Sequence, residues 1–330
     1  KAFFVDDRIF FIKVIAMASS SKTIFSSDGI NLENWKLLLQ KSPAKTNINE
    51  FISKMIRLNL PNSVFLDCTD GNSIIPYYKK ILSSSIPIVT PNKNACSNKL
   101  SLYSTLNKIS KHNNVRFHYS ATVGVGIPSL DIIQSLLRGG DKVLSIEGLF
   151  SSTMNYVLNE LMYSGKKFSD IILEAQKLGM TEPDPRNDLT GLDSAKKILI
   201  LAREAGANLE LAEIKIQNLV TKKLQRAQTQ SELINQLKQM DKYFSRLKKL
   251  TIATNKKLIY LASYKNNSAS VKIVRVNSTH PFNNISANEK IISIKSKFYS
   301  KTPLIIKGRG GGVDVTARVL ISDIIKTIKN

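Results

Sequence analysis

Residues 64–120, VFLDCTDGNSIIPYYKKILSSSIPIVTPNKNACSNKLSLYSTLNKISKHNNVRFHYS, decide the fold class of this chain. Short apolar runs alternate here with helical patterns: strands are predicted at 64–69, 87–90 and 115–120, and helices at 74–82 and 94–112. Strands that alternate with helices of this length form βαβ units, and successive units build a mostly parallel, doubly wound sheet. In such a sheet ligands bind beyond the carboxyl ends of the strands.

The residues before this stretch add one strand and one helix but no phosphate-binding turn. FFIKVIAMA (10–18) has the apolar character of a strand, and a helix is predicted around Trp35. A dinucleotide-binding domain normally begins with a strand, a G-x-G-x-x-G turn and a helix. No such turn occurs in the first half of the sequence, although GVG (124–126) is rich in glycine. The doubly wound sheet is therefore predicted without its usual phosphate-binding turn.

The second half of the chain has a different order of elements. A strand at 141–150 is followed first by helices and then by more strands: helices are predicted at 152–165, 168–179, 193–206 and 230–248, and strands at 257–264, 270–277, 291–299 and 303–308. Elements that no longer alternate indicate an α+β unit whose sheet is mainly antiparallel. The glycine turn GRGGG (308–312) then leads into a final amphipathic helix.

Composition excludes several classes of protein. Two cysteines and three histidines among 330 residues form neither a disulfide framework nor a zinc-ligand spacing, which favours a reducing, cytoplasmic compartment. No apolar run reaches the roughly 18 residues of a membrane-spanning helix. The formal charge of +23 is spread along the whole chain without a nucleic-acid-binding motif, so we expect neither a nucleic-acid nor a membrane partner. A basic nucleic-acid-binding protein stays open as an alternative.

The stretch KLGMTEPDPRNDLTGLDSAKK (177–197) gathers carboxylates on one loop of this basic chain. Glu182, Asp184, Asp188 and Asp193 fall within twelve positions. Prolines on both sides of Asp184 make the backbone there stiff and extended. The loop is therefore predicted to be a rigid acidic segment that leads into a helix.

That helix is expected to begin near Asp193, after a turn at Gly191. Asp193 and Lys197 are four residues apart and so share one face. An exposed ion pair at this spacing contributes only a few tenths of a kcal/mol. However, residues 198–202, ILILA, are apolar around the whole helix, which indicates burial. A lysine at the entrance of a buried helix, opposite acidic groups, fits a general acid/base, and both interpretations stay open on the residues alone.

Two further segments follow predicted strands, where ligands are expected. In TPNK (90–93), Lys93 can meet a phosphate or a carbonyl, or it can cap the preceding turn. In SATVGVGIP (120–128), the glycines permit close backbone approach, and the carbonyls of such a turn can hold a cation. A plain strand-to-helix turn is the simpler interpretation of the second segment.

Read together, these segments resemble one family. TPNK, ATVGVGIP, GLFSSTMNYVL (148–158), GMTEPDPRNDLTGLDSAKK (179–197) and GRGGGVDVTA (308–317) occur in the order found in homoserine dehydrogenases. INLENW (30–35) resembles the dehydrogenase half of bacterial bifunctional aspartokinase–homoserine dehydrogenases. The resemblance implies interconversion of aspartate 4-semialdehyde and homoserine with NAD or NADP, in threonine and methionine biosynthesis, and an aspartate kinase activity in the full-length chain.

The resemblance also implies a role for each site residue. Lys197 and Lys93 are the expected catalytic residues, and Glu182, Asp193 and Asp188 the expected substrate-binding residues. The expected cofactor-binding residues are Thr69, Lys93 and Gly310, and a monovalent cation is expected at Val123, Val125 and Ile127.

Several positions depart from the family pattern. The first strand and its glycine-rich loop are absent, and Lys1 is expected to fall in the helix that follows them. Ser152 stands where the family has glycine, Met180 where it has tyrosine, and Ser120 where it has an acid before the cation-binding turn.

The resulting prediction is an α/β chain with an incomplete doubly wound, Rossmann-like sheet and an α+β catalytic and dimerisation domain. The expected divisions are 1–119 for NAD(P) binding, 120–307 for catalysis and dimerisation, and 308–330 for a glycine turn and helix that return to the cofactor domain. A homo-oligomeric homoserine dehydrogenase is the leading hypothesis. The alternative is a catalytically impaired descendant that serves as a fold or dimerisation module.

Overall fold

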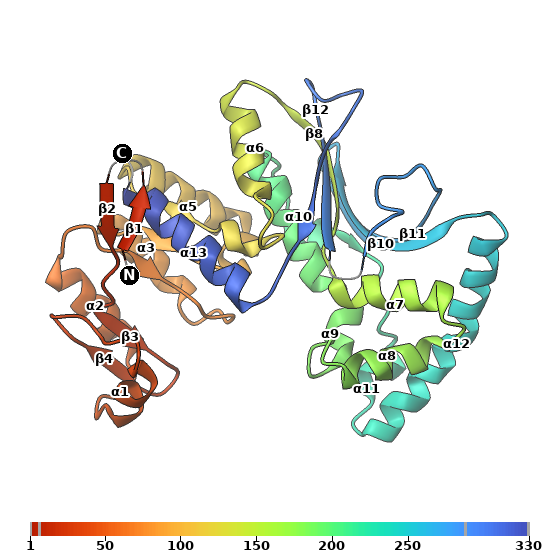
Figure 1. Cartoon of the computed structure of the whole chain (residues 1–330), viewed down its shortest axis with the longest axis horizontal. Coiled ribbons are helices and arrows are strands. Elements are labelled where there is room, and N and C mark those ends of the chain that lie inside the picture. The colour runs from red at the N-terminus through yellow and green to blue at the C-terminus, as the bar shows by residue number, and fades with distance from the viewer. Residues whose placement is uncertain (1, 6–7, 287–288, 329–330) are drawn as a thin grey trace.

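The parallel sheet expected from residues 64–120 is present as three short strands. The computed structural model describes residues 2–5, 8–286 and 289–328, and Figure 1 shows two lobes. The parallel sheet belongs to the N-terminal lobe. The strands lie in the order β5 (Phe65–Leu66), β6 (Ile88–Val89) and β7 (Phe117–His118), and both pairs are parallel. The helices of this lobe are α1 (Trp35–Lys41), α2 (Ile48–Leu58), α3 (Tyr78–Ser83), α4 (Lys93–Ser97) and α5 (Leu100–His112).

The prediction of one strand at 10–18 is wrong. Strand β2 (Arg8–Phe11) pairs antiparallel with β1 (Ala2–Val5), and β3 (Ala16–Ala18) pairs antiparallel with β4 (Thr23–Phe25). The segment SSSK folds back on itself, because Ser19 and Lys22 exchange backbone and side-chain hydrogen bonds across a turn. Lys1 itself lies outside the described residues, but the chain right after it is extended, so the expected helix does not continue there. Neither hairpin joins the parallel sheet.

The predicted helix at 94–112 is two helices with a break at Asn98. Asn98 is extended, with φ −70° and ψ −171°, so α4 ends and α5 starts two residues later. The carbonyls of Cys96 and Asn98 are thereby freed from helical bonding and accept hydrogen bonds from Arg203 of α10 (Leu192–Glu204). The break is therefore a contact point between the two lobes.

The second lobe contains a six-stranded mixed sheet, as the α+β prediction required. Its order is β13 (Leu304–Arg309), β12 (Glu289–Ser296), β8 (Val143–Leu149), β10 (Lys257–Lys265), β11 (Ser268–Val276) and β9 (Lys215–Ile216). All pairs are antiparallel except β9–β11. The hairpin between β10 and β11 turns at Asn266 and Asn267, which both adopt the left-handed conformation that asparagine tolerates.

Helices of the second lobe lie beside and below this sheet in Figure 1. They are α6 (Ser129–Arg138), α7 (Ser152–Tyr163), α8 (Phe168–Lys177), α9 (Pro185–Leu189), α11 (Lys222–Arg226) and α12 (Gln230–Ile252). Short 3₁₀ turns occur at 75–77, 120–122 and 211–213. The apolar core is continuous between the lobes, since Tyr78 and Ile88 belong to the same buried cluster as Ile198 and Leu199.

The C-terminal helix α13 (Val313–Ile328) crosses back to the N-terminal lobe. Its Leu320 is buried against Val89 of β6 and Ala121. Its Asp323 is fully buried and accepts hydrogen bonds from the backbone and the hydroxyl of Ser120, at 3.1 and 2.9 Å. A carboxylate thus lies beside Ser120, although it comes from a distant helix.

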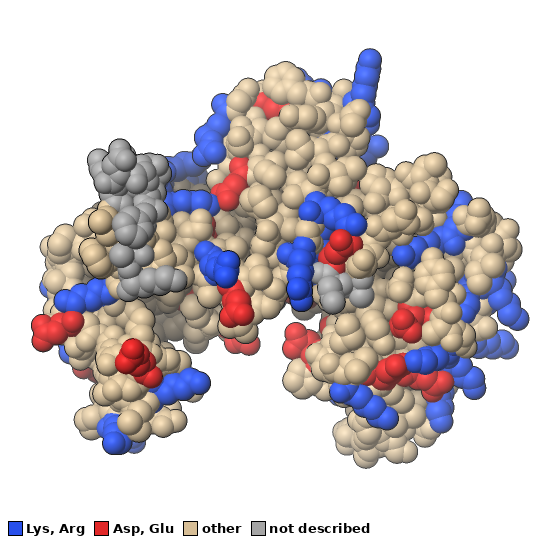
Figure 2. Space-filling view, viewed as in Figure 1, with Lys and Arg blue, Asp and Glu red and all other residues tan. Residues whose placement is uncertain are grey.

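The surface shows how the excess of basic residues is distributed. On the face drawn in Figure 2, lysine and arginine side chains lie over both lobes and are mixed with acidic ones, without a single large basic patch. Charges spread in this way are typical of solvated surfaces, as the sequence predicts. Among the described residues, no helix combines the length and hydropathy needed to cross a bilayer.

Candidate active site

The acidic loop is held rigid by its own side chains. Asp184 is extended, as the flanking prolines predict, and its carboxylate caps α9 by accepting from the N–H of Arg186 at 3.0 Å. The Arg186 guanidinium also pairs with Asp184 at 2.7 Å and donates to the carbonyl of Ala227 at 2.8 Å. Asp184 is therefore a structural residue that anchors the loop to the segment before α12.

Gly191 sets the direction in which the helix leaves this loop. It has φ +75° and stands directly before α10, which begins at Leu192 as expected. A Cβ at this position would overlap the Tyr260 hydroxyl and lie 3.0 Å from the Ile216 side chain. Residues 198–202 of α10 are fully buried, which confirms the prediction made from their apolar run. The first turn of α10 is thus fixed in position by a buried helix behind it.

Three predicted site residues from two segments meet at this first turn. Lys197 Nζ lies 2.6 Å from one Asp193 carboxylate oxygen, and Lys93 Nζ lies 3.2 Å from the other. Lys197 also donates to the carbonyl of Phe150 at 3.1 Å. Burial tends to raise the pKa of Asp193, but the two ammonium groups outweigh it and hold that pKa below its ordinary value. Because Lys93 belongs to the N-terminal lobe, the trio is shared between the lobes.

Two further lysines that the sequence did not single out lie close to this trio. Lys196 donates to the side-chain oxygen of Asn94 at 2.7 Å, and burial together with the charge of Lys93 lowers its pKa. Lys290 of β12 is 8% exposed and donates to the hydroxyl of Ser152. Burial and the neighbouring Lys197 charge lower the pKa of Lys290 to about 8, although Asp193 opposes them. Four ammonium groups therefore lie around one carboxylate, which makes this region strongly attractive to anions.

The other two predicted substrate residues lie next to each other on the loop. Asp188 accepts from the Thr153 hydroxyl at 2.7 Å through one oxygen and from the backbone N–H of Glu182 at 2.9 Å through the other. Asp188 thereby joins the loop to the first turn of α7. The Glu182 side chain is exposed on the loop surface.

Thr69 lies at the carboxyl edge of the parallel sheet, where a cofactor is expected. Its N–H donates to Asp67 at 2.8 Å, and its hydroxyl accepts from the Asn92 amide at 3.2 Å. Asn92 is buried and also donates to the Gly71 carbonyl at 2.8 Å. These hydrogen bonds join the loops after β5 and β6, and Lys93 follows directly after Asn92.

Gly310 lies against the same region from the side of the second lobe. A Cβ on Gly310 would come within 2.6 Å of the Lys290 side chain and 3.0 Å of the Val125 carbonyl. Gly126 has φ +92°, and a Cβ there would come within 2.8 Å of Val315. The turn at 123–127 and the C-terminal glycine turn therefore approach so closely that side chains are excluded from both.

The carbonyls of the expected cation site all accept hydrogen bonds from the chain. Val123 accepts from the Ser129 hydroxyl at 3.2 Å, Val125 from the Gly311 N–H at 3.0 Å, and Ile127 from the Ser129 N–H at 2.7 Å. A carbonyl oxygen has a second lone pair, so a cation ligand role for these three residues stays a prediction.

Comparisons with known proteins agree with this geometry. A family model described as "Homoserine dehydrogenase" matches residues 128–325, and one described as "Homoserine dehydrogenase, NAD binding domain" matches residues 12–120. The chain belongs to the homoserine dehydrogenase family. Homoserine dehydrogenase of Schizosaccharomyces pombe is 34% identical over 322 residues, which are 95% of this chain and 85% of that protein.

The names of several longer relatives include a second activity, aspartokinase. Bifunctional aspartokinase/homoserine dehydrogenase 2, chloroplastic, of Zea mays is 36% identical over 319 residues, which are 96% of this chain and 35% of that protein. The chain therefore spans about a third of the length of such bifunctional homoserine dehydrogenases.

Solved structures share the fold of the whole chain. A Candida auris protein of unknown function is 34% identical, with a TM-score of 0.88 over 96% of this chain and 90% of that one. A hyperthermophilic archaeal homoserine dehydrogenase in complex with NADPH is 23% identical, with a TM-score of 0.72 over 96% of this chain and 88% of that one. The predicted combination of a Rossmann-like sheet with a separate mixed-sheet domain is confirmed.

Sequence reasoning missed Lys290, Lys196 and the bonds of Ser152 and Thr153. Lys290 stands in an ordinary strand pattern almost a hundred residues after Asp193, so no local spacing connects them. Ser152 is visible in the sequence only as a departure from the family pattern, and that departure gives no sign of its partner.

Proposed function

We propose that this protein is an NAD(P)-dependent homoserine dehydrogenase, which interconverts L-aspartate 4-semialdehyde and L-homoserine. The observation that carries the proposal is the trio of Lys93, Asp193 and Lys197 at the meeting point of the two lobes. Such a trio matches the reaction, because a carboxylate binds the substrate ammonium group and a lysine moves the proton of its hydroxyl group.

The fit to a dinucleotide is best at the nicotinamide end. Thr69 and Asn92 lie at the carboxyl edge of the parallel strands, and Gly310 brings bare backbone close to Lys290. These residues would hold the nicotinamide half, which supplies the hydride acceptor when it is bound. The sequence offers no G-x-G-x-x-G turn for the diphosphate, and Gly29 is the only glycine before residue 71.

In this proposal residues 1–119 bind the cofactor, residues 120–307 bind the substrate and form the dimer contact, and residues 308–330 return to the cofactor domain. Glu182 and Asp193 bind the substrate ammonium group, and Asp188 holds their loop against α7. Lys197 takes the hydroxyl proton of homoserine when hydride leaves its carbon, and it returns the proton in the reverse direction. Lys93 keeps Asp193 ionised and lies beside the cofactor.

Further properties belong to the whole protein. We propose a homo-oligomer that works in the cytoplasm, which the two unpaired cysteines support. The names of the bifunctional relatives support an aspartate kinase activity in the full-length chain. The backbone turn at 123–127 is the proposed site of a monovalent cation.

The test is homoserine oxidation by the full-length protein, with NAD⁺ and NADP⁺ supplied separately and reduced cofactor measured by absorbance. Lys197→Ala is expected to reduce kcat by about 10²- to 10⁴-fold, the usual contribution of general acid–base catalysis. Lys177→Ala, at the exposed end of α8, is the matched control and should keep the parental rate. A folded protein without turnover would support the alternative of a fold or dimerisation module. Unchanged turnover in Lys197→Ala would refute the assigned mechanism.

A further inference from the structure

We propose that Lys290 binds the carboxylate of the substrate and so makes the enzyme selective for an amino acid over the corresponding amine. The inference rests on the proposed function, because it assigns the one charged group of homoserine that the acidic loop and Lys197 do not meet. Lys290 lies outside the sequence motifs that resemble the family.

Lys290 reaches the site from the sheet. It lies on β12 next to Gly308 of β13, and its ammonium group donates to the hydroxyl of Ser152 in the first turn of α7. Its side chain is 8% exposed, whereas Ser152 is exposed. The lysine stem is thus buried against Gly310, and its charged end emerges beside α7. An ammonium group has three donors, so two are left for a ligand after the bond to Ser152.

The charge of Lys290 has no counter-charge in the described part of the chain. No Asp or Glu oxygen there lies within 4.0 Å of its nitrogen, while Asp193 is already shared by Lys93 and Lys197. A buried cation without an anionic partner is costly, and a bound carboxylate removes that cost. Burial and the charge of Lys197 lower the pKa of Lys290 to about 8, so it is largely protonated at neutral pH and can bind an anion.

Lys290 and Lys197 bind to the same short segment, because Lys197 donates to the Phe150 carbonyl and Lys290 to the Ser152 hydroxyl. Lys290 and Lys197 influence each other electrostatically, and Asp193 acts on both. Homoserine carries a hydroxyl, an ammonium and a carboxylate group on a four-carbon chain. With the hydroxyl at Lys197 and the ammonium at the carboxylates of Asp193 and Glu182, two nearby lysines have no ion pair among the described residues. Lys196 donates to the side-chain oxygen of Asn94 in the N-terminal lobe, whereas Lys290 donates to Ser152 beside the substrate side of the trio.

The experiment compares two ligands that differ only in the carboxylate. We would measure the KM for homoserine and the competitive inhibition constant of 3-aminopropan-1-ol in the full-length protein and in Lys290→Met, Lys290→Arg and Lys257→Met. Circular dichroism and thermal melting check that each variant is folded.

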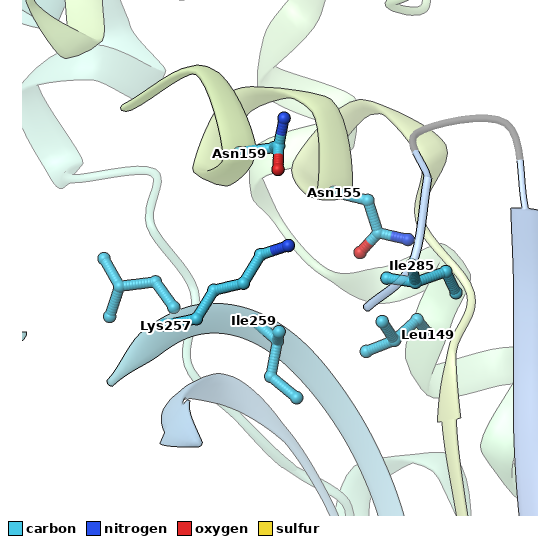
Figure 3. Close-up of a pocket in the computed structure, with 7 residues that line it drawn as sticks. Leu149, Asn155, Asn159, Lys257, Ile259 and Ile285 are labelled. Carbon is cyan, nitrogen blue, oxygen red and sulfur yellow. The ribbon is translucent and has the colours of Figure 1, made fainter. Parts of the chain in front are cut away.

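Lys257→Met is the matched control, because Lys257 is also a partly buried lysine of the same sheet. It lies on β10 and donates to the carbonyl of Asn283, and burial lowers its pKa as well. Figure 3 shows it in a small pocket below α7, together with Asn155 and Asn159. Asn155 and Asn159 lie three and seven residues beyond Ser152 on α7, and no hydrogen bond joins Lys257 to Ser152 among the described residues.

In Lys290→Met the KM for homoserine is expected to rise by roughly 10- to 100-fold, the usual effect of losing a hydrogen bond to a charged group. The inhibition constant of 3-aminopropan-1-ol should stay within about twofold, and Lys290→Arg should recover much of the loss. If both ligands weaken equally, Lys290 only supports the structure of the site. If kcat falls while the KM is unchanged, Lys290 takes part in the proton transfer instead. Either result overturns the inference, whereas a parental enzyme inactive on homoserine would refute the proposed function itself.

Discussion

Replacement of Gly191 by alanine tests how helix α10 is positioned. Two costs add at this position. A left-handed conformation costs a non-glycine residue about 1–2 kcal/mol, and Gly191 has φ +75°. The new methyl group would also overlap the Tyr260 hydroxyl and lie 3.0 Å from Ile216, and overpacking of this kind costs about 1–3 kcal/mol. The expected loss in the free energy of unfolding is therefore about 2–5 kcal/mol.

The two costs can be separated by a second substitution. Tyr260→Phe removes the oxygen that meets the methyl group, and its own hydrogen bond to the Gln217 carbonyl is long, at 3.5 Å. Gly191→Ala should therefore cost about 1–3 kcal/mol less in the Tyr260→Phe background than in the parental protein. Urea unfolding of all four proteins, followed by circular dichroism, gives the coupling energy. A coupling energy near zero would refute the close approach of the Tyr260 hydroxyl as the reason for glycine here.

Three further predictions concern charged groups. Arg203→Lys keeps the charge but loses the planar guanidinium group that donates to three carbonyls. We expect the free energy of unfolding, measured with urea, to fall by about 3–5 kcal/mol. Asp193→Asn leaves Lys93 and Lys197 without their shared counter-charge, and steady-state kinetics should show a lower kcat and a higher KM for homoserine with little change in melting temperature. The folded-state pKa of Lys290 is lowered to about 8, so the unfolded chain holds this proton to a higher pH than the folded chain does. The free energy of unfolding should therefore rise between pH 8 and 10.5 by about 3 kcal/mol relative to Lys290→Met. Equal pH profiles of unfolding in the two proteins would contradict the burial of that charge.

The elements that the sequence predicted well are those with a local cause. Gly191 and the apolar run at 198–202 are enough to place the start and the burial of α10, because both signals lie within one helix. The alternation between 64 and 120 likewise predicts the parallel sheet. By contrast, the run at 10–18 has the composition of one strand, and only the turn bonds between Ser19 and Lys22 explain why the chain folds into hairpins there.

The parts of the site that the sequence could not predict depend on distant pairing. Lys93 and Asp193 are a hundred residues apart, and their meeting is implied by family resemblance rather than by spacing. Lys290 reaches Ser152 only because β12 pairs with β8, a register that a strand pattern does not specify. Buried lysine contacts of this kind require the tertiary structure.

Helix α10 also sets the spacing between two distant contacts of the lobes. Its first turn carries Asp193 and Lys197, and its last turn carries Arg203, which holds the break between α4 and α5. Thirteen residues give a length of about 20 Å and fix an angular phase of about 100° per residue. One residue inserted in the middle would turn Arg203 by about 100° relative to Asp193 and Lys197 while leaving both ends helical. Both contacts between the lobes are therefore kept only when the number of residues in α10 is kept.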